Sequence, residues 1–419
     1  MFIEEIVKSN RCVGCRNCEN ICPANSIKMK NDEEGFLVPD IDYGLCISCN
    51  QCQFVCPNYQ LKYREEKKLP NAIILRNLDI NSAKKSASGG LCSDLAYSFL
   101  ETKGGYICGC IYDSSFRAFH IITNEIQMID KMRGSKYVQS DLTDCFKQIK
   151  EKLNQNIFVL FIGVGCQVYA LKKFLKKEYD NLYTIDLLCH GVPSPLVFKT
   201  YIEWLIGKYK KLIYINNRDK KLYLNSYIPV YSYIIGSGKK IQRRYSDDPM
   251  ATSFFNHLSI RKCCFDCSFK TIHRISDLTI GDFWFSEQIG FGKDQYGVNL
   301  CVIQSEKGKS LLEIIKSDFN YCDIDTDLAV VLNGGMFYES AKASPNRANF
   351  FSELGKISFD KLVFKYDGVG KVKRLKYFLR EIVAPMLRLT NYYFIKKTQE
   401  FNKRKQRKVP LNKKGLTYY

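Results

Sequence analysis

The chain has 419 residues, is 46% apolar and carries a formal net charge of +20. Its length exceeds that of a typical single domain, which predicts two or three domains. A membrane span is not expected, because the longest apolar run, around 158–166, is too short to cross a bilayer. A signal peptide is not expected either, because the first residues, MFIEEIVKSNRC, contain early acidic residues. In a chain without a secretion signal, 19 cysteines indicate metal or redox chemistry in the cytoplasm in place of disulfides.

A cysteine motif occurs twice near the start of the chain. CVGCRNCENICP at 12–23 and CISCNQCQFVCP at 46–57 both read C-x2-C-x2-C-x3-C-P. In two-cluster ferredoxins of this type, the fourth cysteine of each motif ligates the other cluster. The repeat therefore predicts a bacterial-type ferredoxin module with two [4Fe-4S] clusters. The predicted ligands are Cys12, Cys15, Cys18 and Cys56 for one cluster and Cys46, Cys49, Cys52 and Cys22 for the other.

Zinc is the alternative for these cysteines, because zinc sites are commonly built from paired CxxC units. Zinc gives no reason for a doubled four-cysteine block with a proline after each copy, at Pro23 and Pro57. We therefore favour two neighbouring iron–sulfur clusters that form an electron relay. The polar segment NYQLKYREEKKLP, at 58–70, predicts a linker to the next domain.

From residue 71 onward, short apolar strands alternate with amphipathic helices, which predicts an α/β domain. NAIILRN is strand-like, SGGLCSDLAYSFLETKGG at 88–105 has helical spacing, and 105–113 and 117–123 resemble a strand pair. A helix near 125–132, the loop RGSKYVQSD and a further helix follow. Neither GVGCQ nor GSGKK has the sequence context of a dinucleotide or phosphate loop.

Two consecutive strand–turn–helix units, 156–177 and 181–205, carry cysteines at equivalent positions. Cys166 and Cys189 follow the carboxyl ends of two strands that we expect to be parallel, and open α/β sheets bind ligands at this edge. CFDC at 264–267 supplies a further CxxC pair. One hypothesis is that these four cysteines form a third metal site. The alternative is that they are small apolar core residues, and spacing alone leaves both open.

Taken in order, several segments resemble the coenzyme F420 hydrogenase/dehydrogenase beta-subunit family. They are SASGGLCSDLA (86–96), RGSKYVQSD (133–141), GVGCQVYALKKFL (163–175), DLLCHGVPSP (186–195), CFDCSFK (264–270) and SDLTIGDFW (276–284). The resemblance implies an iron–sulfur flavoprotein that passes electrons between clusters and a two-electron substrate. Relatives usually carry Thr-Pro where this chain has Val164 and Gly165, which leaves the placement of Cys166 less fixed.

The resemblance further implies a third [4Fe-4S] cluster and an FAD. The implied ligands of the third cluster are Cys166, Cys189, Cys264 and Cys267, with Cys263 as a bystander. The loops that match flavin-contacting regions of relatives contribute Ser88, Gly89, Gly90, Ser135, Lys136 and Tyr137. Backbone amides of Ser-Gly-Gly at a helix start suit a pyrophosphate, and Lys136 would balance the charge of a reduced flavin.

His190 follows the implied ligand Cys189 and is the candidate catalytic proton donor near the flavin. The alternative is a histidine that hydrogen-bonds the turn. His120, in a strand-like run, and His257, in a predicted apolar helix, are expected to be structural.

The positive charge is concentrated near the end of the chain, in NKRKQRKVPLNKK at 402–414. It suits an acidic electron carrier or anionic lipid, whereas no nucleic-acid-binding motif accompanies it, so nucleic acid is not an expected partner. The segment 377–397 mixes apolar, aromatic and basic residues, which suits a helix on the cytoplasmic face of a membrane. A helix packed on the protein body is the alternative.

We therefore predict an N-terminal ferredoxin-like α+β module followed by an α/β flavin- and cluster-binding core. The expected domains are 1–60 (two-cluster ferredoxin), 71–160 and 161–345 (the N- and C-terminal parts of the beta-subunit-like domain) and 346–419 (a basic extension). The expected function is an iron–sulfur, flavin-dependent oxidoreductase that uses a ferredoxin- or flavodoxin-type carrier. Its small-molecule substrate is unidentified, and surface-polysaccharide metabolism is the setting suggested by bacterial relatives. The alternatives are a non-catalytic electron-transfer subunit and, on charge alone, a nucleic-acid-binding cluster protein.

Overall fold

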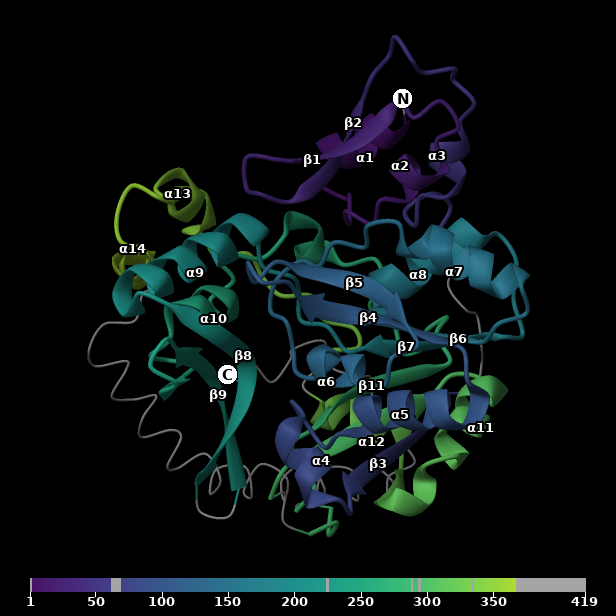
Figure 1. Cartoon of the computed structure of the whole chain (residues 1–419), viewed down its shortest axis with the longest axis vertical. Helices are drawn as coiled ribbons and strands as arrows, with labels where there is room; N and C mark the ends of the chain where they lie inside the picture. The colour runs from purple at the N-terminus through teal and green to yellow at the C-terminus, as the bar shows by residue number, and fades with distance from the viewer. Residues whose placement is uncertain are drawn as a thin grey trace, which may run out of the picture.

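In the computed structural model, a small N-terminal module lies against one side of a larger α/β body (Figure 1). The structure describes residues 2–61, 69–223, 226–287, 289–292, 295–333 and 335–366. The predicted membrane-surface helix and the basic segment at 402–414 lie outside these residues. None of the helices in the described ranges is both long enough and apolar enough to cross a membrane.

The N-terminal module consists of short helices and one β-hairpin. Its elements are α1 (Phe2–Lys8), α2 (Asn17–Ile21), β1 (Ile27–Asn31), β2 (Leu37–Ile41) and α3 (Gln51–Phe54). Each cysteine motif forms a turn that leads into a helix, and the residue before that helix, Arg16 or Asn50, has a left-handed backbone. The strands β1 and β2 pair antiparallel, with Ile27 opposite Ile41. This is the ferredoxin-like α+β arrangement that the motif repeat predicts.

A sheet of eight strands forms the centre of the body. Their order across the sheet is β13 (Phe319–Ile324), β3 (Asn71–Asn77), β12 (Val298–Ile303), β11 (Leu278–Phe283), β7 (Leu182–Leu187), β6 (Val159–Val164), β4 (Tyr106–Tyr112) and β5 (Ala118–Thr123). The strands β11, β7, β6 and β4 run parallel, and the flanking strands pair antiparallel. Because strands from both sides of residue 160 share the sheet, the two predicted parts of the core form one structural body.

Helices cover both faces of this sheet (Figure 1). α5 (Leu91–Lys103) and α11 (Glu306–Glu313) pack on one face together with Leu160 of β6. α7 (Cys145–Asn154) and α8 (Gly165–Leu175) pack on the other face together with Phe161. Successive side chains of a strand point to opposite faces of the sheet, and a central parallel strand is buried on both faces. This explains why β6 is formed by a continuous apolar run, VLFIGV. Shorter helices complete the layers: α4 (Ile80–Lys85), α6 (Met128–Met132) and α12 (Thr326–Leu332).

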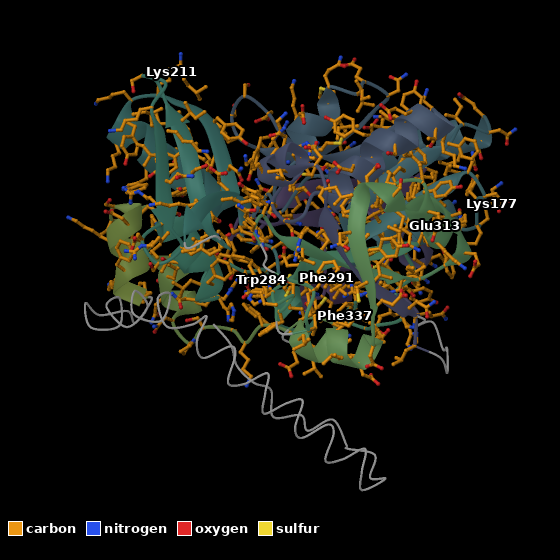
Figure 2. The ribbon with its side chains drawn as sticks, turned by 90° about the horizontal axis from the view of Figure 1, so that it is seen from below. Lys177, Lys211, Trp284, Phe291, Glu313 and Phe337 are labelled. Atoms are coloured by element: carbon orange, nitrogen blue, oxygen red, sulfur yellow. The ribbon has the colours of Figure 1, made fainter. Side chains whose placement is uncertain are left out.

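A second, three-stranded antiparallel sheet stands beside the first. It contains β8 (Leu212–Tyr223), β9 (Ser226–Ile235) and β10 (Lys240–Arg244), covered by α9 (Pro195–Tyr209), α10 (Pro249–Phe255), α13 (Arg347–Ser352) and α14 (Phe359–Tyr366). Its core includes the fully buried Tyr201, Tyr231 and Phe350. Figure 2 shows this sheet on the side marked by Lys211, away from Lys177. The described start of the predicted C-terminal extension therefore packs into this layer.

The predicted fold class, a ferredoxin-like module followed by an α/β core, is confirmed. The predicted strand pair is the antiparallel ladder β4–β5, and the two strand–turn–helix units are β6–α8 and β7–α9, with β6 and β7 parallel. The helical placement of His257 was wrong. α10 ends at Phe255, and the chain turns so that the His257 amide donates to the Phe254 carbonyl.

Candidate functional site

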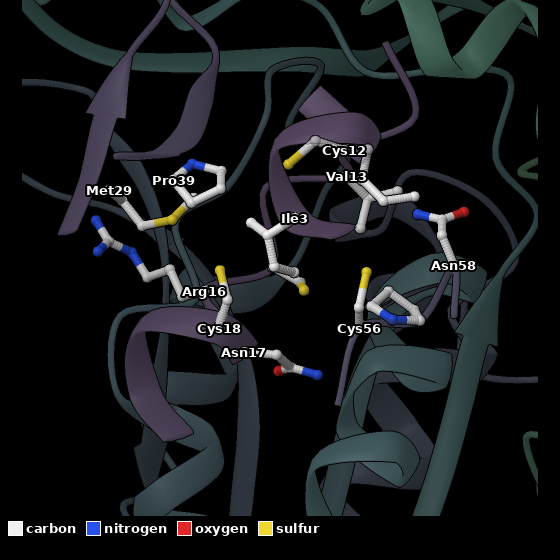
Figure 3. A pocket seen from close by; sticks show the side chains of 13 residues that line it. Ile3, Cys12, Val13, Arg16, Asn17, Cys18, Met29, Pro39, Cys56 and Asn58 are labelled. Atoms are coloured by element: carbon white, nitrogen blue, oxygen red, sulfur yellow. The ribbon is translucent and has the colours of Figure 1, made fainter. Parts of the chain in front are cut away.

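Four cysteines of the N-terminal module surround one cavity, which we call the inner site. Cys12, Cys15 and Cys18 come from the first motif, and Cys56 comes from the second. Figure 3 shows the sulfur atoms of Cys12, Cys18 and Cys56 directed toward the same space. The cavity has a volume of about 360 Å³, part of it open to solvent. The structure thus brings together the crossed set of cysteines that the motif repeat predicts.

In the absence of a bound cation, the surroundings of the inner site favour the neutral, protonated form of its cysteine thiols. Burial raises the pKa of Cys15 and Cys18 well above the usual value, and it raises the pKa of Cys56 to about 11. The Gly14 amide donates to the Cys12 sulfur at 3.4 Å, which is the kind of bond that stabilises a ligated thiolate. Four such thiols around a cavity are a chemically suitable donor set for an iron–sulfur cluster.

The second predicted set, the outer site, is nearer the surface. Cys52 is buried, Cys22 and Cys46 are half-buried, and Cys49 is exposed. Although burial opposes the shift, the Ser26 hydroxyl lowers the pKa of Cys22, whose sulfur lies 3.2 Å from the Ser26 oxygen. The chain around these cysteines carries large exposed apolar side chains and no charge between residues 43 and 54. The apolar side chains are Tyr43, Leu45, Ile47 and Phe54.

Four further cysteines line a cavity in the body, which we call the core site. They come from three separate segments and are Cys166, Cys189, Cys264 and Cys267. Burial raises the pKa of Cys166, and the neighbouring Cys267, Cys189 and Cys264 thiols raise it further. The cavity has a volume of about 670 Å³, part of it open to solvent, and Cys263 also lies on its wall. Within the described ranges, no group of three or more His, Cys, Asp or Glu side chains is placed to hold a metal ion, and this applies to the inner, outer and core cysteines alike.

The turn that carries Cys166 lacks the family's Thr-Pro, and other contacts hold it. The Val164 amide donates to the Gln167 side-chain oxygen at 3.1 Å, and the Gln167 amide donates to the Ser140 hydroxyl at 3.0 Å. A Cβ on Gly165 would lie 2.5 Å from the Arg274 guanidinium. Glycine therefore lets Arg274 approach the turn, and Cys166 lines the core cavity without the missing proline.

The inner and core sites adjoin each other. Val13 and Asn58, both from the N-terminal module, line both cavities. The contact is fixed by hydrogen bonds across the junction: Gln139 Nε2 donates to the Val13 carbonyl at 3.2 Å, and Asn17 Nδ2 donates to the Ala170 carbonyl at 2.8 Å. The two sets of thiols are thus separated by a thin wall of protein.

Basic residues at the core site were missed by the sequence reasoning. Arg261, Lys270 and Arg274 line the cavity. Arg274 Nη1 lies 3.7 Å from Asp186, and Lys270 Nζ donates to the Met336 carbonyl at 3.3 Å. The only feature of the sequence that could have indicated these residues is that Lys270 and Arg274 follow CFDC closely in the chain.

His190 also lines the core cavity, and its Nε2 lies 2.9 Å from Nε2 of His257. His257 Nδ1 lies 2.7 Å from the Lys342 carbonyl, which can only accept, so Nδ1 of His257 carries the proton. The neutral pair then requires His190 Nε2 to donate to His257. Burial lowers the pKa of His190 to about 4, so the imidazole is neutral near pH 7. This bond ties the Cys189 turn to the residues that follow α10, and a catalytic role for His190 stays a prediction.

The two predicted flavin loops lie near each other. Arg133, at the end of α6, donates to the hydroxyls of Ser86 at 2.8 Å and Ser93 at 2.7 Å. It thereby joins the loop of Ser135–Tyr137 to the loop of Ser88–Gly90, which precedes α5. Lys220 of β8 donates to the Ser88 carbonyl at 2.7 Å. Both cations, which the sequence reasoning did not name, have further partners: Arg133 pairs with Asp130 at 2.8 Å, and Lys220 Nζ also donates to the Ala83 and Tyr296 carbonyls. A diphosphate at this cluster stays a prediction.

Two of the predicted flavin residues have structural contacts of their own. Lys136 Nζ donates to the carbonyls that end α6, including that of Met132 at 2.7 Å and that of Arg133 at 2.9 Å. Loss of hydration lowers the pKa of Lys136 to about 8. Tyr137 stacks on Phe254 with ring centroids 4.9 Å apart. These contacts fix the shape of the loop, and a flavin role for the two side chains stays a prediction.

Two families of known proteins match parts of the chain. Residues 11–59 match the family described as 4Fe-4S dicluster domain, and residues 158–326 match the family of the carboxyl-terminal region of the coenzyme F420 hydrogenase/dehydrogenase beta subunit. A solved structure of the F420-reducing [NiFe] hydrogenase complex from Methanosarcina barkeri contains a chain that is 14% identical. That match covers 72% of this chain and 90% of the other, with a TM-score of 0.42. No curated protein matches the chain.

A dicluster module on an α/β core defines an iron–sulfur protein of electron transfer, in the oxidoreductase class. Within that class, residues 158–326 match the carboxyl-terminal region of the coenzyme F420 hydrogenase/dehydrogenase beta subunit, the family that the motifs of the sequence resemble.

Proposed function

We propose that the chain is an iron–sulfur flavoprotein that connects a one-electron carrier to a small-molecule substrate. The observation that carries this proposal is the shared wall of the inner and core sites, since Val13 and Asn58 line both cavities. A redox role for adjoining thiol sets explains why cysteines from three segments of the body gather beside a ferredoxin module. A purely structural role for the core cysteines gives no reason for this placement.

Each proposed group has a matching set of residues. The inner, outer and core sites would each hold a [4Fe-4S] cluster on four cysteines, and the loops around Arg133 and Lys220 would hold the FAD diphosphate. When bound, clusters exchange single electrons and a flavin exchanges either one or two, which couples a carrier to two-electron chemistry. The chain itself supplies the thiols and the cations, and it buries Cys18 and Cys56 of the inner site.

The carrier, of ferredoxin or flavodoxin type, is proposed to approach the outer site. Cys49 is exposed there, whereas Cys18 and Cys56 of the inner site are buried. An uncharged surface with exposed apolar side chains lets another protein come close without desolvating charges. The substrate remains a small molecule of unassigned class, and the surface-polysaccharide setting rests on the family resemblance alone.

The proposal is tested by the composition of the full chain purified without oxygen. We expect about twelve irons, matching acid-labile sulfide and about one FAD per chain, from three four-iron clusters and a flavin. About eight irons would refute the core cluster, and absence of flavin would refute the flavoprotein assignment.

Two adjacent cysteines provide a matched pair of variants. Cys264→Ala is expected to lower the iron content to about eight per chain, whereas Cys263→Ala is expected to keep about twelve. Both thiols lie on the core cavity wall and are half-buried, so the comparison separates ligation from packing. Equal iron in both variants would contradict the assigned ligand set.

A further inference from the structure

Four arginine side chains are buried in the described part of the chain, and one of them differs from the others. Three face a carboxylate: Arg218 pairs with Asp282, Arg274 with Asp186 and Arg347 with Glu34. Arg261 is 5% exposed, and its guanidinium donates to three neutral oxygens. These are the Cys12 carbonyl at 2.8 Å, the Leu37 carbonyl at 2.9 Å and the Gln139 side-chain oxygen at 3.1 Å.

A buried guanidinium without a counter-ion is energetically unfavourable. Three hydrogen bonds use part of its five N–H donors, and the Phe36 ring lies 5.1 Å from its central carbon, but neither neutralises the charge. Asp32 attracts the guanidinium through space, yet no ion pair within 4 Å joins Arg261 to a carboxylate of the described residues. Buried charges in native proteins are normally paired or face a metal centre, because the lost hydration is otherwise not replaced. The position of Arg261 therefore points to negative charge that arises nearby when the protein is complete.

Both thiol sets lie next to Arg261. On one side, it binds the carbonyl of Cys12, and a Cβ on Gly14 of the same loop would lie 3.0 Å from its Nη1. On the other side, it lines the core cavity, and the Cys264 amide donates to the Arg261 carbonyl at 3.0 Å. An oxidised [4Fe-4S] cluster on four thiolates carries a charge of about −2, so two such groups would enclose the guanidinium between negative charges.

We infer that Arg261 is a positioning residue shared by the inner and core sites, where it supplies the counter-charge for both sets of cysteine ligands. Gln139 fixes it in place, because the Gln139 side chain accepts from Arg261 and donates to the Val13 carbonyl in the wall between the sites. The core half of this inference rests on the proposed function, whereas the inner half rests on the dicluster module.

A fixed positive charge in a poorly solvated region favours the form of a neighbouring group that has gained an electron. Arg261→Gln is therefore expected to shift the reduction potentials of the inner and core groups to more negative values. Arg261→Lys keeps the charge and loses the planar fork, so a smaller shift is expected. Gln139→Glu adds a carboxylate beside an unchanged Arg261, and it is expected to shift both potentials in the same negative direction.

The matched control is the double variant Glu34→Gln/Arg347→Gln. It removes one of the ion pairs between the module and the body, in which Arg347 Nη1 lies 2.7 Å from Glu34, without changing the net charge. It also removes the second contact of Glu34, with Lys262 Nζ at 3.2 Å. We expect unchanged potentials in this variant. A shift as large as that of Arg261→Gln would mean that loosening the junction is sufficient, and it would overturn the inference.

The measurement is a redox titration of the full chain, purified without oxygen, followed by electron paramagnetic resonance after iron analysis. Negative shifts of two signals in Arg261→Gln and Gln139→Glu, with none in the control, support the inference. Unchanged potentials in chains that keep about twelve irons overturn it while leaving the proposed function intact. About eight irons in the wild-type chain would instead refute the core cluster itself, and with it the shared role. If Arg261→Gln does not fold, Gln139→Glu and Arg261→Lys decide the question.

Discussion

Arg16 of the N-terminal module and Asp141 of the body form a two-pronged ion pair, with Nη2 2.8 Å from Oδ2 and Nε 2.5 Å from Oδ1. Both side chains are largely buried at the junction, so removal of one partner leaves a poorly hydrated charge. The module is thus fastened to the body by specific contacts in addition to the connecting chain.

Asp141→Asn is expected to destabilise the protein by about 1–3 kcal/mol, because Arg16 loses its partner in the body. Thermal unfolding of the iron-loaded chain measures the effect as a lower midpoint. Glu19→Gln is the matched control, since Glu19 is the partner of Arg16 within the module and its loss leaves the junction pair in place. An equal decrease of the unfolding midpoint in both variants would show that the junction pair contributes no more to stability than the pair within the module.

Gly14→Ala is expected to disturb the inner site. Gly14 has φ 69°, and a Cβ at this position would lie 2.4 Å from Gln139 Nε2 and 2.9 Å from the Leu37 carbonyl. The left-handed backbone alone costs an alanine about 1–3 kcal/mol, and the clash with backbone adds to it. We expect a lower iron content and a lower unfolding midpoint.

The control for that substitution is Gly44→Ala, which lies in the same module beside the second cysteine motif. Its added Cβ would meet only an Asp42 side-chain oxygen, at 3.2 Å. Iron content and midpoint should stay close to those of the wild-type chain. Iron loss in Gly44→Ala but not in Gly14→Ala would contradict the strain argument.

Asp248 gives the stability of the body a predictable pH dependence. Burial raises the pKa of Asp248 to about 6, although Tyr201 donates to its carboxylate at 2.8 Å and two amides at the start of α10 also bind it. In the unfolded chain the pKa returns to about 3.9. The folded state then binds more protons than the unfolded state, so this contribution is full below about pH 4 and is lost as the pH rises through about 6.

Asp248→Asn keeps an oxygen for the helix cap and has no charge to bury. Its stability relative to the wild type should therefore increase between pH 4 and pH 7, by about 3 kcal/mol at most. Unfolding midpoints of both chains at the two pH values, in buffers of equal ionic strength, measure the difference. A stability difference that is flat with pH would contradict the raised pKa.

The surface thiols report whether the outer site is loaded. Of the 19 cysteines, Cys49 and Cys322 are exposed. If Cys49 ligates a cluster, a thiol reagent should modify only Cys322 rapidly in the iron-loaded chain, and both residues after iron is removed by a chelator. Cys322→Ser provides the control, because its loaded form should show no rapid reaction. Rapid reaction of Cys49 in the loaded chain would argue against its role as a ligand.

Local sequence signals predicted much of the fold. The run VLFIGV followed by GCQVYALKKFL specifies a buried strand and a helix through composition and period, and the structure has β6 and α8 there. The crossed placement of Cys56 beside Cys12 was predicted from the spacing of one repeated motif. These features depend on short stretches of chain, where sequence and structure are closely linked.

Arg261, Gln139 and Lys220 were not predicted, because their roles depend on partners far away in sequence. Arg261 meets the Cys12 loop across 249 residues, and Lys220 reaches the Ser88 carbonyl across 132. Nothing in RKCC or RDKK distinguishes these side chains from solvated surface charges. The pairing of His190 with His257 was missed for the same reason, since it requires the end of α10 to return to the Cys189 turn.

The uneven burial of the three thiol sets implies an order of damage in air. Oxygen and chelators reach the outer set first, because Cys49 is open to solvent, whereas Cys18 and Cys56 of the inner set are buried and all four core cysteines are half-buried. A preparation exposed to air would lose the outer cluster, through which electrons would enter, while the inner and core sites kept their iron and their absorbance. Such protein would look intact by absorbance, yet it would respond poorly to a protein donor and well to a small chemical reductant that diffuses to the interior.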